Sequence, residues 1–246
     1  MSLLSAVVGL ADDALVLGHR LSEWCGKAPF LEEDLAMANT ALDLLGRARL
    51  LYGHAEKLGG SNEDEYAFLR DAPDFTNLLI YELPASDFAT AYARQLLIDV
   101  FDELYFDALQ GSQDDTLAGI AAKSYKEAVY HVRHSSAWLL RLGDGTDESH
   151  ARMQQALEDV WGYHLELFEN PSADVSLVAN GALPDRAVLK AAWSERVREL
   201  VERATLTVPA GNWSVAGGRT GVHTEHLGFL LAEMQHLPRT YPGVNW

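Results

Sequence analysis

The sequence lacks the features that mark several protein classes. Its only cysteine, Cys25, has no partner for a disulfide within the chain, which is typical of proteins in a reducing cytoplasm. The first 21 residues lack the basic start, the long apolar run and the cleavage site of a signal peptide. No stretch is apolar enough to span a bilayer. We therefore expect a cytoplasmic protein with no membrane partner.

Basic residues are scarce as well. Lysine and arginine number 19 against 36 aspartates and glutamates, so the formal net charge is −17. Such a chain repels the phosphates of nucleic acids and anionic membrane surfaces. The sequence also has no Gly-rich phosphate loop, Cys-x-x-Cys pair or nucleophile elbow. We therefore expect no nucleic-acid partner.

Strand patterns are nearly absent, because alternating runs of β-branched residues hardly occur. Apolar residues instead recur every three or four positions, the spacing of one helix face. This periodicity predicts helices at about 5–24, 32–58, 87–110, 114–142, 147–169, 185–205 and 222–238, joined by surface connections that include 61–66, 170–184 and 207–221. Asp87 and Asp185 have the side chain and position of N-caps. With 48% hydrophobic residues and no visible linker, the chain is expected to form one all-α domain over residues 1–246.

Two predicted helix pairs have matched spacing. Ala14 precedes Leu44 by 30 residues, and Asp99 precedes Ala128 by 29. Each half of a carboxylate-bridged di-iron site has a carboxylate on one helix and Glu-x-x-His on the next, because residues three apart share a helix face. Here the second motif reads Leu-Leu-Gly-Arg from Leu44 and Ala-Val-Tyr-His from Ala128. The spacing of a metal site is present, but most of its ligands are missing.

Longer segments resemble a known family. They are LVLGHRLSEWCGKAPFLEEDLAMANTALDLLGRAR, FTNLLIYELPASDFATAYARQLLID, KEAVYHVRHSSAWLLRLGDGTDES, MQQALEDVW and GVHTEHLGFLLAEMQHLPRTYPG. From about Leu10 to Trp246 the chain resembles the non-catalytic, ferritin-like structural subunit (PaaC-type) of the bacterial phenylacetyl-CoA epoxidase, a multicomponent ring 1,2-monooxygenase. The resemblance implies a ferritin-like helical bundle with a four-helix core and additional C-terminal helices. It also implies a structural subunit with no activity by itself, which supports a catalytic homologue in aerobic phenylacetate degradation.

The resemblance further implies where the catalytic homologue holds its two iron ions. Those positions correspond to Ala14, Leu44, Arg47, Asp99, Ala128 and His131. Only Asp99 and His131 are ligand residues, so we expect no catalytic residue, metal or other cofactor in this chain and a di-iron centre in the partner subunit. The expected partners are that iron-bearing homologue, in a heterodimer or higher assembly, and a reductase reached through the complex.

A buried arginine and a buried carboxylate each lose too much solvation to stand alone. We therefore predict an ion pair between Arg47 and Asp99 in the former metal cavity. The apolar faces around Leu15–Trp24 and Leu96–Phe106 are candidates for contact with the partner.

Two other functions stay open at this point. One is an active di-iron oxygenase or oxidase with an atypical site built from Asp99, Glu127, His131 and a C-terminal cluster. The other is a free-standing helical module that binds a small molecule. The C-terminal cluster consists of His223, Glu225, His226, Glu233 and His236. It also fits a structural role, in which Glu225 favours the positive end of a helix dipole.

Overall fold

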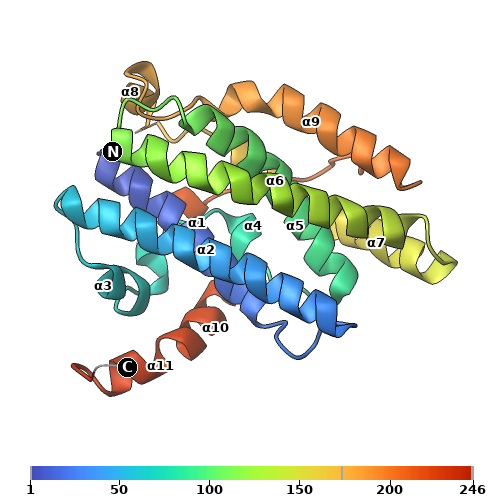
Figure 1. Ribbon diagram of the computed structural model, residues 1–246, viewed down its shortest axis with the longest axis horizontal. Helices are drawn as coiled ribbons and strands as arrows, with labels where there is room; N and C mark the ends of the chain where they lie inside the picture. Colours follow the sequence, from blue (N-terminus) through green and yellow to red (C-terminus); the bar gives the residue numbers. More distant parts are fainter. Residues whose placement is uncertain (1, 173, 245–246) are drawn as a thin grey trace. The chain divides into compact units, whose positions relative to one another are not determined.

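A computed structural model describes residues 2–172 and 174–244. Within these residues the chain forms helices and no strand, which confirms the all-α class (Figure 1). The α-helices are α1 (Leu3–Ser22), α2 (Leu31–Lys57), α3 (Glu63–Phe68), α4 (Leu79–Glu82), α5 (Phe88–Leu109), α6 (Asp115–Gly143), α7 (Asp147–Trp161), α8 (Val175–Ala179), α9 (Arg186–Arg203), α10 (Glu225–Met234) and α11 (His236–Thr240). The 3-10 helices are η1 (Ala72–Asp74), η2 (His164–Phe168) and η3 (Gly218–Thr220).

Five long helices agree with the predicted ranges, and both predicted N-caps are confirmed. The predicted helix at 147–169 is instead α7 followed by η2, the one at 222–238 is α10 followed by α11, and the predicted connection at 170–184 contains the short helix α8. Asp87 accepts a hydrogen bond from the Thr90 N–H at 2.8 Å, and Asp185 accepts one from the Ala187 N–H at 2.9 Å. The prediction of a loop at 61–66 is wrong. Asn62 caps α3 by accepting from the Glu65 N–H at 2.9 Å, and the acidic first turn of α3 favours the positive end of its dipole.

Contacts along the chain divide it into two compact units. Unit 1 comprises Met1–Pro84 and Gly217–Trp246, and unit 2 comprises Ala85–Ala216. Each unit contains one of the two long helix pairs that the spacing analysis predicted, α1 with α2 in unit 1 and α5 with α6 in unit 2. The single domain over residues 1–246 stays a prediction.

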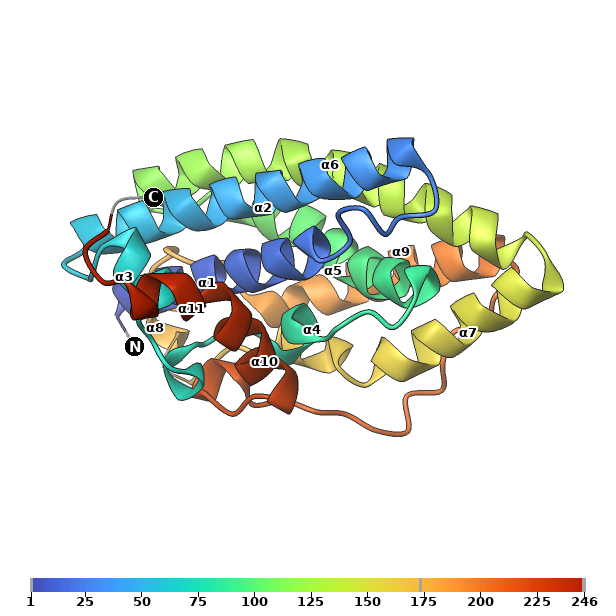
Figure 2. The same cartoon turned by 90° about the horizontal axis from the view of Figure 1, so that it is seen from below.

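In unit 1, α1 and α2 lie side by side in opposite directions (Figures 1 and 2). Every residue of α1 from Ala6 to Gly18 is buried, as expected of a helix that is apolar on nearly all sides. Helix α4 packs on α1, α3 packs on α2, and α10 packs on η1. The segment from Gly217 onward thus completes the fold of the first 84 residues.

In unit 2, α5 is the central helix and packs against α6, α7 and α9. Its residues from Ala91 to Asp102 are all buried. Trp193 on α9 is 1% exposed and donates its indole N–H to the Leu97 carbonyl at 3.0 Å, which joins α9 to α5. Most apolar side chains of Leu15–Trp24, which begins in α1, and of Leu96–Phe106 in α5 are therefore buried within the chain. The prediction that these faces form free contact surfaces is wrong.

No helix in residues 2–172 and 174–244 has both the length and the apolar character needed to cross a membrane.

Candidate functional site

The three vestigial positions of unit 1 lie on α1 and α2, and their side chains are buried. Ala14 is 2% exposed, Leu44 is 1% exposed and Arg47 is 2% exposed. A methyl group and an isobutyl group have no lone pair for a metal, and a guanidinium is a cation with donor N–H groups only. These three positions therefore offer no metal ligand.

The three vestigial positions of unit 2 lie on α5 and α6 and keep two polar side chains. Asp99 is 2% exposed, His131 is 3% exposed, and Ala128 is fully buried. The Gln95 amide donates to Asp99 Oδ1 at 2.7 Å. Burial raises the pKa of Asp99 to about 6, although the nearby His131 and the hydrogen bond from Gln95 oppose this rise. The carboxyl group is thus poised to take up a proton near neutral pH.

These donors do not fit a di-iron centre. Such a centre in a ferritin-like bundle needs four carboxylates and two imidazoles. The six positions here supply one carboxylate and one imidazole, and they add the positive charge of Arg47. Among the residues that the structure describes, no group of three or more His, Cys, Asp and Glu side chains is arranged to hold a metal. The ion pair between Arg47 and Asp99 would join the two units, and it stays a prediction.

Glu127, a proposed ligand of the atypical site, has a different neighbour. It forms an ion pair with Lys123, one turn earlier on α6. Such i,i+4 pairs are common on exposed helix faces and stabilise them slightly.

The C-terminal cluster separates into individual contacts, of which the one at His223 is the most constrained. His223 Nδ1 donates to Glu82 Oε2 at 2.7 Å, and Nε2 donates to the Phe75 carbonyl at 2.8 Å. The Phe75 carbonyl requires a proton on Nε2, so His223 is an imidazolium whenever Nδ1 also donates to Glu82. Burial alone lowers the pKa of His223, but the bonds to Glu82 and Phe75 outweigh burial and raise that pKa overall. Both ring nitrogens of His223 therefore already take part in hydrogen bonds.

Glu82 is the buried partner in this arrangement. Its side chain is fully buried, and it also accepts from the Thr224 N–H at 2.6 Å and from the Asn77 amide at 2.8 Å. Glu225 lies in the first turn of α10, as the sequence predicted. The cluster thus begins a helix and attaches it to α4.

Comparison with known proteins decides the family. The profile of the family described as "Phenylacetic acid catabolic protein" matches residues 1–246. The chain belongs to that family. It is also 48% identical over 238 residues to the C subunit of 1,2-phenylacetyl-CoA epoxidase from Escherichia coli (strain K12), and the alignment covers 96% of each chain. These findings confirm the resemblance seen in the sequence and assign the chain to phenylacetic acid catabolism.

The sequence did not predict the hydrogen-bond partners of Asp12, a residue of α1 that is 0% exposed. Asp12 accepts from the Tyr52 hydroxyl at 2.6 Å, from Arg70 Nη2 at 2.5 Å and from the Thr76 N–H at 2.8 Å. The need for partners could be seen in the sequence, because a buried carboxylate in an apolar helix must be paired and hydrogen-bonded. The partners were not predictable, because Arg70 lies 58 residues away.

Asp13 is paired in the same manner with a different arginine. It forms an ion pair with Arg219 and accepts from the Leu78 N–H at 2.8 Å. Arg219 also donates to the Gly9 carbonyl at 2.9 Å. Neither Asp12 nor Asp13 is therefore available to replace the ligand lost at Ala14.

Proposed function

We propose that the chain is a structural, non-catalytic subunit that pairs with an iron-bearing homologue in a phenylacetyl-CoA epoxidase. The observation that carries the proposal is the loss of four of the six ligand positions, with losses in both helix pairs. The Escherichia coli relative is named as a subunit of such an enzyme, which supports a role within an assembly. In this proposal the di-iron centre belongs to the partner, and electrons come from a separate reductase.

Packing gives a physical reason for such a subunit. A di-iron site needs ligands held rigidly in a water-excluded bundle. A homologous bundle whose own cavity is closed, here with buried Leu44 and Ala128, is a rigid surface on which those helices can pack. A cytoplasmic location without nucleic-acid or membrane partners belongs to the same proposal, and the net charge of −17 and the lone Cys25 support it.

Co-expression with the iron-bearing homologue tests the proposal. We expect a stable complex that buries well over ~2,000 Å², in the range of obligate assemblies. Iron should co-purify with the complex and be absent from the chain expressed alone. The isolated chain should consume no O2 with phenylacetyl-CoA, ferrous iron and a reductant.

Two results would contradict the proposal. One is stoichiometric iron in the isolated chain together with O2 consumption coupled to phenylacetyl-CoA, which would favour the atypical oxygenase. The other is a pair of separate monomers in size-exclusion chromatography at micromolar concentration.

A further inference from the structure

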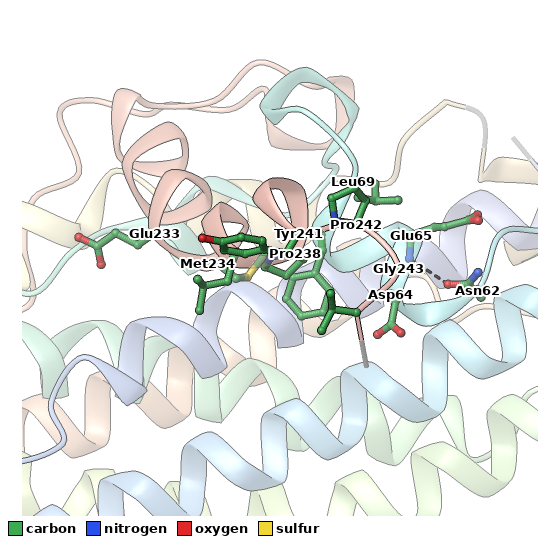
Figure 3. A pocket seen from close by; sticks show the side chains of 13 residues that line it. Asn62, Asp64, Glu65, Leu69, Glu233, Met234, Pro238, Tyr241, Pro242 and Gly243 are labelled. Atoms are coloured by element: carbon green, nitrogen blue, oxygen red, sulfur yellow. Dashed lines mark hydrogen bonds between the residues drawn. The ribbon is translucent and has the colours of Figure 1, made fainter. Parts of the chain in front are cut away.

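Unit 1 contains an open groove between α3 and the C-terminal helices α10 and α11 (Figure 3). Its volume is about 1050 Å³. Large apolar side chains line it: Phe68, Leu69, Met234, Leu237, Tyr241 and Val244. A cavity of this size can receive several side chains of another molecule.

Hydrogen bonds attach the C-terminal helices to the end of α3. Gln235 donates to the carbonyls of Ala67 at 3.0 Å and Arg70 at 2.9 Å. Arg239 donates to the carbonyls of Phe68 at 3.1 Å and Arg70 at 2.8 Å. Carbonyls in the last turn of a helix have no partner within the helix, so these two side chains cap α3. Because α10 and α11 are fixed to α3, a ligand would meet a preformed groove, which reduces the ordering cost of binding.

The apolar residues of the groove are unusually open to water. Leu69 is 56% exposed, Leu237 is 51% exposed and Tyr241 is 53% exposed. Contiguous exposed apolar residues rimmed by polar ones mark interaction sites. The apolar faces of α1 and α5, in contrast, are buried within the chain. The groove is therefore a better candidate for partner contact than those faces.

The charge of the groove indicates the chemistry of its occupant. Asp64 and Glu65 lie at one end, and Glu233 lies on the other side of the apolar side chains (Figure 3). No lysine, arginine or histidine belongs to the lining that the structure describes. A second copy of this chain is a poor occupant, because two molecules of net charge −17 repel each other. A segment with lysine or arginine would be attracted.

We propose that this groove receives a basic, apolar segment of the iron-bearing partner subunit. Large apolar side chains of that segment pack against Leu69, Leu237 and Tyr241, and its cationic side chains lie beside Asp64, Glu65 and Glu233. The inference rests on the proposed function, because it assigns the contact surface of that assembly.

A charge-reversal experiment on the complex tests the electrostatic part. The groove variant D64K/E65K/E233K is compared with the control E158K/D159K/E199K, which changes the net charge equally at exposed carboxylates of unit 2. Association with the purified iron-bearing subunit is measured at low and high salt. The groove variant should associate at least ~10-fold more slowly at low salt, and the difference should shrink as salt screens the charges. The control should associate at the wild-type rate.

A second variant tests the apolar part. Replacing Leu69 and Leu237 with serine removes exposed side chains, so the melting temperature should stay near that of the wild type. Dissociation of the complex should become roughly 10- to 100-fold faster, as for apolar anchors at the centre of an interface. Hydrogen–deuterium exchange should show protection of α3, α10 and α11 in the complex relative to the free chain.

The outcomes separate this inference from the proposed function. A stable complex without protection of the groove, and with wild-type binding of both groove variants, overturns the inference and leaves the structural subunit intact. If the control variant slows association as much as the groove variant does, the inference is also overturned. Absence of any complex overturns both. Protection of the groove in a dimer of this chain alone would assign it to self-association and overturn the inference.

Discussion

The charge pair between His223 and Glu82 attaches the C-terminal segment of unit 1 to α4, and its removal measures the strength of that attachment. The His223 side chain is 4% exposed and the Glu82 side chain is 0% exposed. His223→Ala would leave the buried carboxylate with two of its three donors, the Thr224 N–H and the Asn77 amide. Removing one partner of a buried pair costs about 3–5 kcal/mol of unfolding free energy. Because two donors remain, we expect the unfolding free energy to fall by an amount near the lower end of this range, about 3 kcal/mol.

The pH dependence gives a second, independent signature. The pKa of His223 is raised in the folded protein, so the folded state holds this proton more tightly than the unfolded state. The pair therefore contributes its full stability below the unfolded histidine pKa of about 6.5 and loses it as pH rises through the folded pKa. The stability difference between wild type and His223→Ala should be largest near or below about pH 6 and smaller at alkaline pH.

The measurement is urea unfolding followed by circular dichroism across this pH range, on a double-mutant cycle of His223→Ala and Glu82→Gln. Contacting residues should show a coupling energy of about 1–3 kcal/mol. His236→Ala, an exposed histidine in the same segment, is the matched control and should change stability little. A loss below about 1 kcal/mol, additive single changes, or a difference independent of pH would refute the reasoning.

Three further outcomes follow from the vestigial positions and from one close contact. Arg47→Ala should cost about 3–5 kcal/mol of unfolding free energy, whereas Arg47→Met combined with Asp99→Leu should cost far less. Equal losses from the single and the double change would contradict an ion pair. Restoring glutamate at the three lost carboxylate positions together with Arg47→His should give measurable ferrous binding by calorimetry, although weak without supporting hydrogen bonds. A folded variant that binds no iron would show that the inferred positions are wrong. Gly162→Ala should destabilise unit 2 and change its tryptophan fluorescence, because a Cβ there would lie 2.0 Å from the Trp213 ring, and an unchanged spectrum and melting temperature would count against this packing.

The long helices could be predicted because burial imposes a regular spacing of apolar residues over many turns. The same reasoning failed at α3, a helix of 6 residues that is too short to show such a period. Its acidic first turn, with Asn62 as the cap, resembles a solvated loop when read by composition alone. The capping geometry, rather than apolar periodicity, explains that helix.

The vestigial site stays a prediction, which rests on residue types at fixed motif positions. The long-range charge pairs of the core could not be predicted. Asp13 and Arg219 are 206 residues apart, and Glu82 and His223 are 141 residues apart. Nothing local in the sequence specifies such pairs, since they depend on how the C-terminal segment folds back onto unit 1.

These long-range pairs explain how unit 1 keeps carboxylates in an apolar core. A buried carboxylate must be neutralised or strongly hydrogen-bonded, and in a di-iron bundle the metal supplies the positive charge. In unit 1 cationic side chains do so: Arg70 for Asp12, Arg219 for Asp13 and His223 for Glu82. In unit 2 burial instead raises the pKa of Asp99 to about 6, which favours partial neutralisation by a proton. The stability of unit 1 should therefore depend on these side-chain cations, and iron chelators should leave its unfolding free energy unchanged.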